Sequence, residues 1–306
     1  MTLVHLSDLH ITSPCGAGPQ SYLNKRASGW LSWKLRRHRL YRREVLERLC
    51  SDFESAPPDH VVITGDLTNL ALEQEFRESL PWLQRLGTPS TVTVVPGNHD
   101  SYVSVSSRES WDHWLPYMTP DADCGAGSVP AFPFVRVRGP VALIGLSSAV
   151  PTPLFDATGC LGAPQLSRLE SLLGSLGEQG LYRVVLIHHP PFDPPVRRRR
   201  HRLRDSDALM AVLRRQGAEL VLHGHLHRRG DARLPGPGDT MIPVLGVSAA
   251  SYAGHHAERL ARYQWIRIEA GGPPDQAAPR RHRVQVETRV YDAGSRRFRA
   301  ESDQVL

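Results

Sequence analysis

The chain has 306 residues, of which 40% are hydrophobic, 7% aromatic and 22% charged. This composition is ordinary for a globular protein and excludes the disordered, collagen-like and disulfide-scaffold classes. No stretch approaches the ~20 apolar residues of a membrane span, and the N-terminus lacks the charged and apolar regions of a signal peptide. The four cysteines are scattered without a CxxC pair, which predicts no disulfide framework. We therefore expect a cytoplasmic protein.

The positive charge is concentrated in two short segments. Residues 19–50 contain nine basic and two acidic side chains, a net charge of +7, and residues 197–204 contain six arginines. Because the whole chain carries a net charge of only +6, the remainder is acidic. This distribution predicts that the two segments meet anionic partners, since a diffusely basic surface would spread the charge along the chain.

Short apolar runs followed by polar clusters recur along the chain and predict strands buried on both faces, with helices between them. The runs lie at residues 3–6, 61–64, 92–95, 141–146, 184–187 and 220–222. The intervening segments expected to form helices are 42–55, 70–86, 164–177 and 205–216. Residues 263–268 and 283–290 alternate instead, which predicts antiparallel strands with one covered face. The chain is therefore expected to form an α/β sandwich of two sheets flanked by helices.

The polar residues with catalytic chemistry stand where the predicted strands end. In chain order, these ends carry Ser7-Asp8-Leu9-His10, Gly65-Asp66, Gly97-Asn98-His99-Asp100, His188-His189-Pro190-Pro191 and His223-Gly224-His225-Leu226-His227. Because ligands of open α/β sheets bind beyond the carboxyl ends of the strands, we expect the five clusters to converge. Carboxylate, imidazole and amide donors without a thiolate favour a divalent transition metal over a structural zinc site.

This series of clusters resembles the pattern of the calcineurin-like metallophosphoesterase superfamily: D-x-H, G-D, G-N-H-[D/E], H and G-H-x-H. The match spans residues 3–227, and the segments 188–191 and 224–227 look most similar to the bacterial class III cyclic nucleotide phosphodiesterase group. The resemblance implies a four-layer αββα fold, with two mixed sheets flanked by helices. We expect one domain over residues 1–306, with a basic Trp/Arg-rich helical insertion at about 19–50 and an Arg-rich loop at about 194–205.

Carried over by position, the resemblance implies a centre of two transition metal ions drawn from Mn, Fe, Zn or Co. The ligands of the first metal would be Asp8, His10, Asp66 and His227. Asp66 would bridge to the second metal, whose remaining ligands would be Asn98, His188 and His225. His99 would lie near the substrate phosphate without binding metal.

The chemistry of such a centre suits phosphoester hydrolysis. Two cations roughly 3.5–4 Å apart can clamp a phosphoryl group and acidify a bridging water, whose hydroxide attacks phosphorus in line with the leaving alkoxide. The alkoxide needs a proton or charge stabilisation, and His99 is the candidate donor. Asp100 either orients that imidazole or stabilises its turn. We expect hydrolysis of small phosphodiesters or cyclic nucleotides, with phosphomonoesters as a further class.

Four more residues are candidates for contact with an anionic phosphoester substrate: His189, Asn69, Arg197 and Arg198. A packing role is the alternative for His189. Asn69 stands where the subgroup often has aspartate, in Gly-Asp-Leu-Thr-Asp. The arginine run either attracts anionic substrates or forms a solvated loop. Because no aromatic side chains interleave this run, the sequence disfavours nucleic acid as a partner.

The basic segment 21–49 places Trp30, Leu31, Trp33 and Leu35 among its arginines. One interpretation is an amphipathic insertion that packs on the domain and exposes its charges. The other is a surface that lies on an anionic membrane or holds an acyl chain, because Trp, Leu and Arg together suit that interface. The segment follows Asp8 and His10, so we expect it to border the active site.

Two alternative functions compete with a small-molecule phosphodiesterase. A peripheral-membrane pyrophosphohydrolase, similar to the UDP-2,3-diacylglucosamine hydrolases, would use the Trp/Arg insertion to hold a lipid-linked nucleotide. His99 argues against it, because those relatives usually have arginine there. A metal-free protein-binding module on the same fold is the alternative from another class, and the complete set of ligand positions argues against it.

Overall fold

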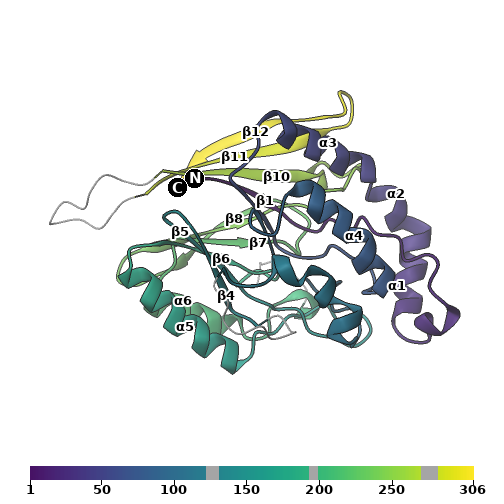
Figure 1. The fold of residues 1–306 in the computed structure, drawn as a ribbon, viewed down its shortest axis with the longest axis horizontal. Helices are drawn as coiled ribbons and strands as arrows, with labels where there is room; N and C mark the ends of the chain where they lie inside the picture. Colours follow the sequence, from purple (N-terminus) through teal and green to yellow (C-terminus); the bar gives the residue numbers. More distant parts are fainter. Residues whose placement is uncertain (122–130, 193–198, 270–281) are drawn as a thin grey trace.

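The computed structural model describes residues 1–121, 131–192, 199–269 and 282–306, and within them two six-stranded sheets stack on one another (Figure 1). The first sheet has the order β12 (Arg297–Val305), β11 (Arg283–Asp292), β10 (Arg262–Glu269), β1 (Thr2–Leu6), β2 (His60–Ile63) and β3 (Val92–Val94). The second has the order β4 (Phe134–Arg138), β5 (Val141–Gly145), β6 (Tyr182–Leu186), β7 (Leu220–His223), β9 (Met241–Gly246) and β8 (Gly230–Pro235).

Alternation along the strands of the second sheet divides its side chains between two cores. Leu143 and Leu222 are buried in the core that this sheet shares with the first sheet. Ile144, next along β5, is buried in a separate core with α5 (Ala163–Glu178) and α6 (Ser206–Gln216). Successive strand residues point to opposite faces, so the second sheet is covered on both sides.

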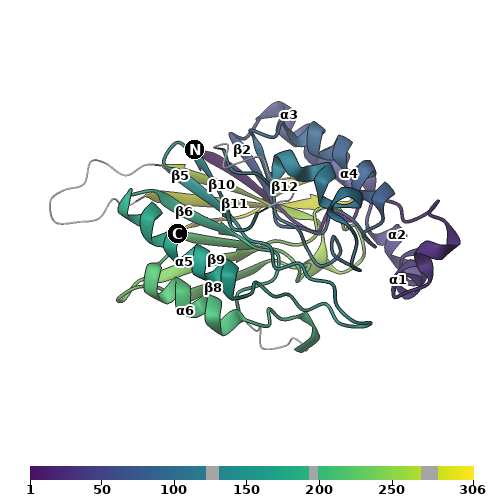
Figure 2. The ribbon, with the colours of Figure 1, turned by 60° about the horizontal axis from the view of Figure 1, so that its bottom comes forward.

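The first sheet is covered by α3 (Arg43–Ser55) and α4 (Glu73–Leu86), which lie on the side of the molecule opposite α5 and α6 (Figure 2). The buried residues of α3 include Val45, Leu49 and Phe53, a spacing of four that places them on one helix face. The order helix, sheet, sheet, helix confirms the predicted four-layer αββα fold.

Both sheets are mixed, and their parallel parts include every strand that precedes a polar cluster. β2 pairs in parallel with both β1 and β3, and β6 pairs in parallel with both β5 and β7. β10 lies antiparallel to β1 on one side and to β11 on the other, as their alternating pattern predicts. The C-terminal strands therefore complete the first sheet beside the strand that begins the chain.

Within the described residues, four strands were not predicted by the apolar runs or by the alternating segments of the sequence: β4, β8, β9 and β12. Three of these, β4, β8 and β12, lie at sheet edges. The four helices of the layers, in contrast, lie within three residues of their predicted bounds.

The inserted segment, residues 19–42, contains the short helical turn Pro19–Tyr22, α1 (Arg26–Ser32), a π-helical turn at Trp33–Arg37 and α2 (His38–Leu40). It lies at one end of the molecule in both views (Figures 1 and 2). Because the following helix α3 buries its apolar face in the layered core, the insertion expected at 19–50 ends near residue 42.

Polar contacts anchor the inserted segment to the body of the protein. The buried Arg26 donates from Nε to Leu70 O at 2.8 Å and from its second nitrogen to Ala71 O. Lys25 Nζ donates to Thr152 O at 2.8 Å. No helix of the described ranges is long and apolar enough to cross a bilayer.

Candidate metal centre

The carboxyl ends of five strands bring seven predicted ligands to one edge where the two sheets meet. From the first sheet come Asp8 and His10 after β1, Asp66 after β2 and Asn98 after β3. From the second sheet come His188 after β6, and His225 and His227 after β7. A hydrogen bond joins the loop after β7 in the second sheet to the loop after β1 in the first: the backbone N–H of His225 donates to Asp8 Oδ2 at 3.0 Å.

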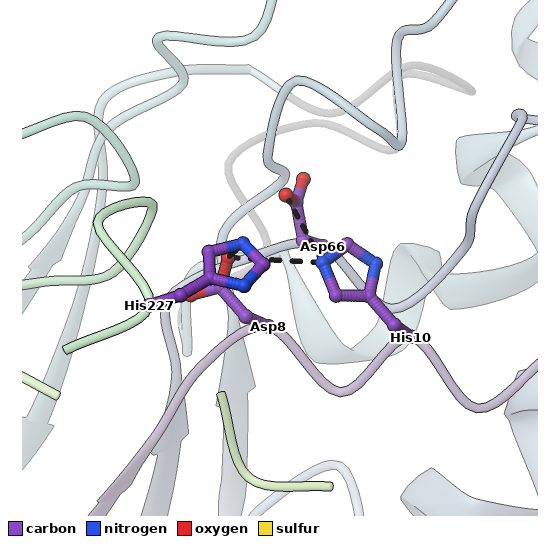
Figure 3. A group of neighbouring side chains, drawn as sticks. All are labelled: Asp8, His10, Asp66 and His227. Carbon is purple, nitrogen blue, oxygen red and sulfur yellow. Dashed lines mark ion pairs between the residues drawn. The ribbon is translucent and has the colours of Figure 1, made fainter. Parts of the chain in front are cut away.

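Asp8, His10, Asp66 and His227 form the first group, in which one ligand atom of each lies within 4.8 Å of the others. His227 Nε2 is 3.0 Å from Asp8 Oδ1, and His10 Nε2 is 3.7 Å from Asp66 Oδ2. Figure 3 shows the rings of His10 and His227 facing each other, with dashed lines that join His10 to both carboxylates.

Asp66 also belongs to a second group with Asn98, His188 and His225. Its Oδ2 atom is 3.4 Å from His188 Nε2, and Asn98 Oδ1 is 3.1 Å from the same nitrogen. His225 Nδ1 lies 2.9 Å from Asn98 Oδ1. One carboxylate oxygen of Asp66 therefore faces histidine nitrogens of both groups, which is the arrangement that a bridging ligand requires.

Left-handed backbone at the strand ends aims these side chains inward. Eight non-glycine residues of the described ranges have positive φ, and five of them are predicted ligands: Asp8 (53°), His10 (45°), Asp66 (58°), His225 (67°) and His227 (50°). This conformation costs roughly 1–2 kcal/mol for each non-glycine residue and concentrates at functional sites. The loops therefore adopt an energetically unfavourable backbone conformation that places these side chains at the centre.

Glycine allows the ligand loops to approach one another closely. A Cβ atom on Gly97 would overlap the Asp66 carboxylate, and one on Gly224 would overlap Ser7 Oγ and crowd Asp8 Oδ2. These two positions are the glycines of the G-N-H-D and G-H-x-H clusters. Each position therefore has no room for a side chain, because the neighbouring loop, with its carboxylate, packs directly against the glycine.

Hydrogen bonds to the second ring nitrogens orient three of the imidazoles. His10 Nδ1 donates to Thr68 O at 3.1 Å and His188 Nδ1 donates to Thr64 O at 2.6 Å, so the Nε2 atom of each ring faces the centre. His227 Nδ1 lies 2.8 Å from the Tyr41 hydroxyl, and its Nε2 faces Asp8. Such partners fix the ring and its tautomer in metal sites.

The residues fit a pair of metal ions, as shown by the acceptors that lack a donor. Asp8 Oδ1 and Asp66 Oδ2 are buried and accept no hydrogen bond from the described residues, although a buried carboxylate oxygen left without a partner is costly. Neighbours of these oxygens include the Nε2 atoms of His227, His10 and His188. A set of oxygen and nitrogen donors without sulfur suits Mn, Fe, Co or Zn.

The charges of the centre also favour cations. Burial opposes ionisation of Asp8 and Asp66, but the neighbouring imidazoles, foremost His227 for Asp8 and His188 for Asp66, hold the pKa of each carboxyl below its usual value. Burial likewise disfavours the charged form of His188, yet Asp66 raises the pKa of this ring to about 9. The two carboxylates are thus anionic and attract positive charge, which a bound metal ion would supply.

His99 lies beside the centre, is partly buried and is held by its own loop. Its Nδ1 donates to Asn69 O at 2.6 Å, and its Nε2 lies 3.2 Å from the Arg37 guanidinium. Burial, followed by the charge of Arg37, lowers the pKa of His99 to about 4. The ring is therefore neutral near pH 7, with the Nε2 lone pair directed into the cleft.

Asp100 stabilises the turn and does not orient the His99 ring. Its carboxylate accepts hydrogen bonds from the backbone N–H groups of Asp66 (2.8 Å), Thr68 (2.9 Å) and Gly97 (2.9 Å). The acceptor that orients the imidazole of His99 is instead the Asn69 carbonyl. Of the two roles considered for Asp100, the structure supports the turn.

Two proposed substrate contacts need correction. The Asn69 side chain is buried and donates from Nδ2 to Thr12 O at 2.8 Å, away from the cleft. His189 is fully buried, with Nδ1 2.8 Å from Ser148 Oγ and Nε2 3.1 Å from Ala157 O. Both side chains have structural partners because they lie beneath the loops that form the cleft. Arg197 and Arg198 lie outside the described residues.

Two residues of the inserted segment reach the centre without being singled out by the sequence pattern. Tyr41 contacts His227, and Arg37 lies between His10 and His99, with guanidinium nitrogens 3.1 and 3.2 Å from their Nε2 atoms. Nothing in a segment with seven lysine and arginine side chains distinguishes Arg37 from its neighbours. The only available signal is its position shortly after the D-x-H cluster.

A cleft of about 290 Å³ opens over the centre, lined by Asp66, Asn98, His225 and His227 at its floor and by Arg36, Arg37 and Arg259 above. It adjoins a second space of about 420 Å³ between α1 and the loop 152–157. Metal ligands thus meet a cationic opening large enough for a small molecule.

The family model for calcineurin-like phosphoesterases matches residues 1–229. The chain belongs to the calcineurin-like phosphoesterase family. The resemblance seen in the strand-end clusters is therefore confirmed, and calcineurin-like phosphoesterases use a dinuclear metal centre, which the grouping around Asp66 accommodates. This phosphoesterase is accordingly a metal-dependent hydrolase, and the metal-free binding module is not supported.

Two bacterial proteins are similar to this phosphoesterase in sequence. A probable cyclic nucleotide phosphodiesterase of Synechococcus sp. is 25% identical over 217 residues, which is 70% of this chain and 74% of the relative. A cAMP/cGMP dual specificity phosphodiesterase of Mycobacterium tuberculosis is 30% identical over 218 residues, 68% of this chain and 59% of the relative.

Solved structures of phosphatases share the fold of this phosphoesterase. A dimetal phosphatase of Danio rerio has a TM-score of 0.54 at 12% identity, covering 100% of this chain and 98% of the other. A purple acid phosphatase of yellow lupin also gives 0.54, at 13% identity, covering 100% of this chain and 53% of the other. At these identities the likeness concerns the fold.

Proposed function

We propose that this phosphoesterase hydrolyses small phosphodiesters, with cyclic nucleotides as the first substrate class. The observation that carries the proposal is the sharing of Asp66 between two groups of ligands beneath a cleft bordered by arginines. The names of both bacterial relatives support the choice of cyclic nucleotides.

The side chains of the cleft have separate tasks in this reaction. Arg36 and Arg259 line the opening and attract an anionic substrate. When bound, a pair of divalent cations neutralises phosphoryl oxygens and lowers the pKa of a bound water. Asp66 holds both ligand groups together, and the backbone partners of His10 and His188 keep their rings aimed at the metal centre.

His99 is proposed to give a proton to the leaving alkoxide from Nε2. In the substrate-free arrangement Nε2 faces the Arg37 guanidinium, and Nδ1 is held by Asn69 O. A phosphate anion between the two side chains would offset the charge of Arg37 and raise the pKa of His99, favouring a proton on Nε2. Asn69 therefore acts on the reaction through its carbonyl group, which fixes the donor ring.

A substrate panel on Mn-reconstituted protein tests the proposal. It should contain 3′,5′-cyclic nucleotides, bis-p-nitrophenyl phosphate, glycerophosphodiesters, DNA at fixed salt, and simple monoesters. We expect diesters to give the highest kcat/KM, and Asp66→Ala to abolish their turnover. Hydrolysis of monoesters alone, or turnover that survives Asp66→Ala, would contradict the assignment.

A lipid-linked nucleotide pyrophosphate is the second candidate substrate, favoured by exposed apolar side chains around the cleft. On the inserted segment, Leu23 is 84%, Leu35 67% and Leu31 50% exposed. Across the second space, Phe155 is 72% exposed on the loop that Lys25 contacts. Exposed leucines among cationic side chains suit the surface of an anionic bilayer.

Liposome co-sedimentation separates this candidate from a freely diffusing substrate. Membrane contact predicts that Leu31→Glu with Leu35→Glu lowers binding to vesicles containing phosphatidylglycerol, whereas Met241→Glu, a matched exposed site on β9, leaves binding unchanged. The same variants should lose activity on UDP-2,3-diacylglucosamine in detergent while keeping activity on bis-p-nitrophenyl phosphate. No activity on the lipid substrate would remove this candidate.

A further inference from the structure

Arg37 is placed differently from the other arginines of the inserted segment. It is partly buried, whereas Arg36 and Arg39 beside it are exposed. It ends the π-helical turn Trp33–Arg37, and such turns are frequent at functional sites because they redirect a side chain. The fold therefore directs one arginine of this helix inward.

The polar neighbours of the Arg37 guanidinium are two imidazole nitrogens and no carboxylate of the described ranges. Its two terminal nitrogens lie 3.1 Å from His10 Nε2 and 3.2 Å from His99 Nε2. It forms no ion pair with any carboxylate of the described ranges, although carboxylate and phosphate are the bidentate partners that arginine prefers. Imidazole nitrogens carry no negative charge, so these two contacts leave the positive charge of Arg37 without a counter-ion, which a bound anion would supply.

Arg37 also stands where two spaces meet. Arg37, Asn98 and His99 line both the cleft over the centre and the adjoining space. Arg259 and Tyr41 border the first space, and Lys25 and Tyr102 border the second. A phosphate beside Arg37 would therefore have room on each side for one substituent, as a diester requires and a monoester does not.

We propose that Arg37 is a phosphate-binding residue, supplied by the insertion, that grips non-bridging oxygens of the substrate at the junction of the two spaces. This inference rests on the proposed function for the identity of the substrate. It extends that function by assigning a specific task to the inserted segment. Once the guanidinium binds the phosphate, His10 Nε2 is free to bind metal and His99 Nε2 is free to face the leaving group.

The competing explanation is that Arg37 occupies a metal position and inhibits loading. The two explanations predict opposite effects of removing the side chain. If Arg37 binds phosphate, removing its side chain weakens anion binding and leaves the metal content unchanged. If Arg37 inhibits metal loading, removing its side chain strengthens metal binding and leaves anion affinity unchanged.

Binding of inorganic phosphate to Mn-loaded protein, measured by calorimetry, tests the inference without depending on turnover. We expect Arg37→Ala to retain two Mn per chain and to raise the phosphate Kd by about ten-fold to a hundred-fold, the size of a charge-assisted hydrogen bond. Arg37→Lys keeps the charge but loses the two-nitrogen fork, so its Kd should lie between those of wild type and Arg37→Ala. The matched control Arg39→Ala removes an exposed arginine of the same segment and should change Kd less than two-fold.

An unchanged phosphate Kd in Arg37→Ala, with wild-type metal content and circular dichroism, would overturn the inference. Tighter Mn binding in Arg37→Ala would overturn it in favour of inhibition. If phosphate binding depends on Arg37 while no diester is turned over, the inference stands and the proposed substrate class fails.

Discussion

The strand ends that carry the metal centre and the inserted segment 19–42 border the same cleft, but their side chains are held in different ways. Six of the seven predicted ligands are buried, and hydrogen bonds between loops fix their positions. The inserted segment exposes Leu23, Leu31 and Leu35 and is anchored at Lys25 and Arg26. The comparison teaches that the strand ends hold the predicted ligands in a buried network, whereas the insertion reaches the same cleft from a segment that leaves its leucines exposed.

The largest expected effect comes from breaking the strand-end region at the residue shared by both ligand groups. Asp66→Ala should reduce phosphodiesterase activity by more than about 10³-fold, because loss of the metal clamp removes several kcal/mol of transition-state stabilisation. Metal analysis should find fewer than two ions per chain. Asp239→Ala, an exposed aspartate, is the control. Full metal content in Asp66→Ala would refute the bridging assignment.

His99→Ala tests whether the side chain beside the centre does chemistry of its own. We expect both metals to remain, and turnover of alkyl diesters to fall by ~10² to 10⁴, the usual range for a lost general acid. p-Nitrophenyl substrates should lose much less, because their leaving group needs no proton. An equal loss with both leaving groups would assign His99 to binding alone.

Tyr41→Phe tests whether the inserted segment supports the metal centre, because it removes a hydrogen bond that joins the two regions. Its hydroxyl lies 2.8 Å from His227 Nδ1, and loss of such a partner typically weakens metal binding by about 10-fold to 100-fold. Competition with a chelator measures the change. Tyr22→Phe removes a hydroxyl bonded to Pro14 O within the same segment and should leave metal affinity unchanged. Equal affinities in wild type and Tyr41→Phe would show that the insertion does not support the centre.

The smallest effect concerns the stability of β1 beneath the centre. His5 is buried, with ring nitrogens 2.9 Å from Gln264 Oε1 and from Thr64 Oγ1, and burial lowers its pKa from 6.5 to about 3. Since the unfolded chain protonates more readily, the contribution of His5 is complete above pH 6.5 and is lost as the pH falls toward 3. The loss between pH 7 and pH 5 is about 2 kcal/mol.

Urea unfolding of metal-free protein at both pH values measures this effect. His5→Gln cannot titrate, so its unfolding free energy should fall by about 2 kcal/mol less than that of the wild type. His38→Gln, at an exposed position of the insertion, should behave as the wild type. Identical pH dependence in His5→Gln and wild type would exclude a role for His5.

The architecture and the ligand clusters were predictable because each depends on local chemistry. Apolar runs such as Val184–Ile187 mark a strand buried on both faces, and the polar residues that follow it stand at the carboxyl end. The glycine of the third cluster, Gly97, is dictated by the Asp66 carboxylate against which it packs. A short stretch of sequence therefore contains the information for each part.

The features that escaped prediction depend on distant partners. At the sheet edges, β12 buries only Phe298, and β4 buries Arg136 through hydrogen bonds to carbonyl groups such as Val92 O, so neither presents an apolar run. β9 is apolar but contains Pro243, a residue that argues against a central strand. The placement of Arg37 depends on a π-helical turn and on loops remote in the chain.

The position of β10 against β1 has a practical consequence for truncated forms of the protein. The family match ends at residue 229, whereas β1 pairs on one side with Arg262–Glu269. A fragment stopped at 229 would leave the backbone of Thr2–Leu6 unpaired along that side. Bare edges of this kind recruit strands from other molecules, so such a fragment should self-associate and precipitate.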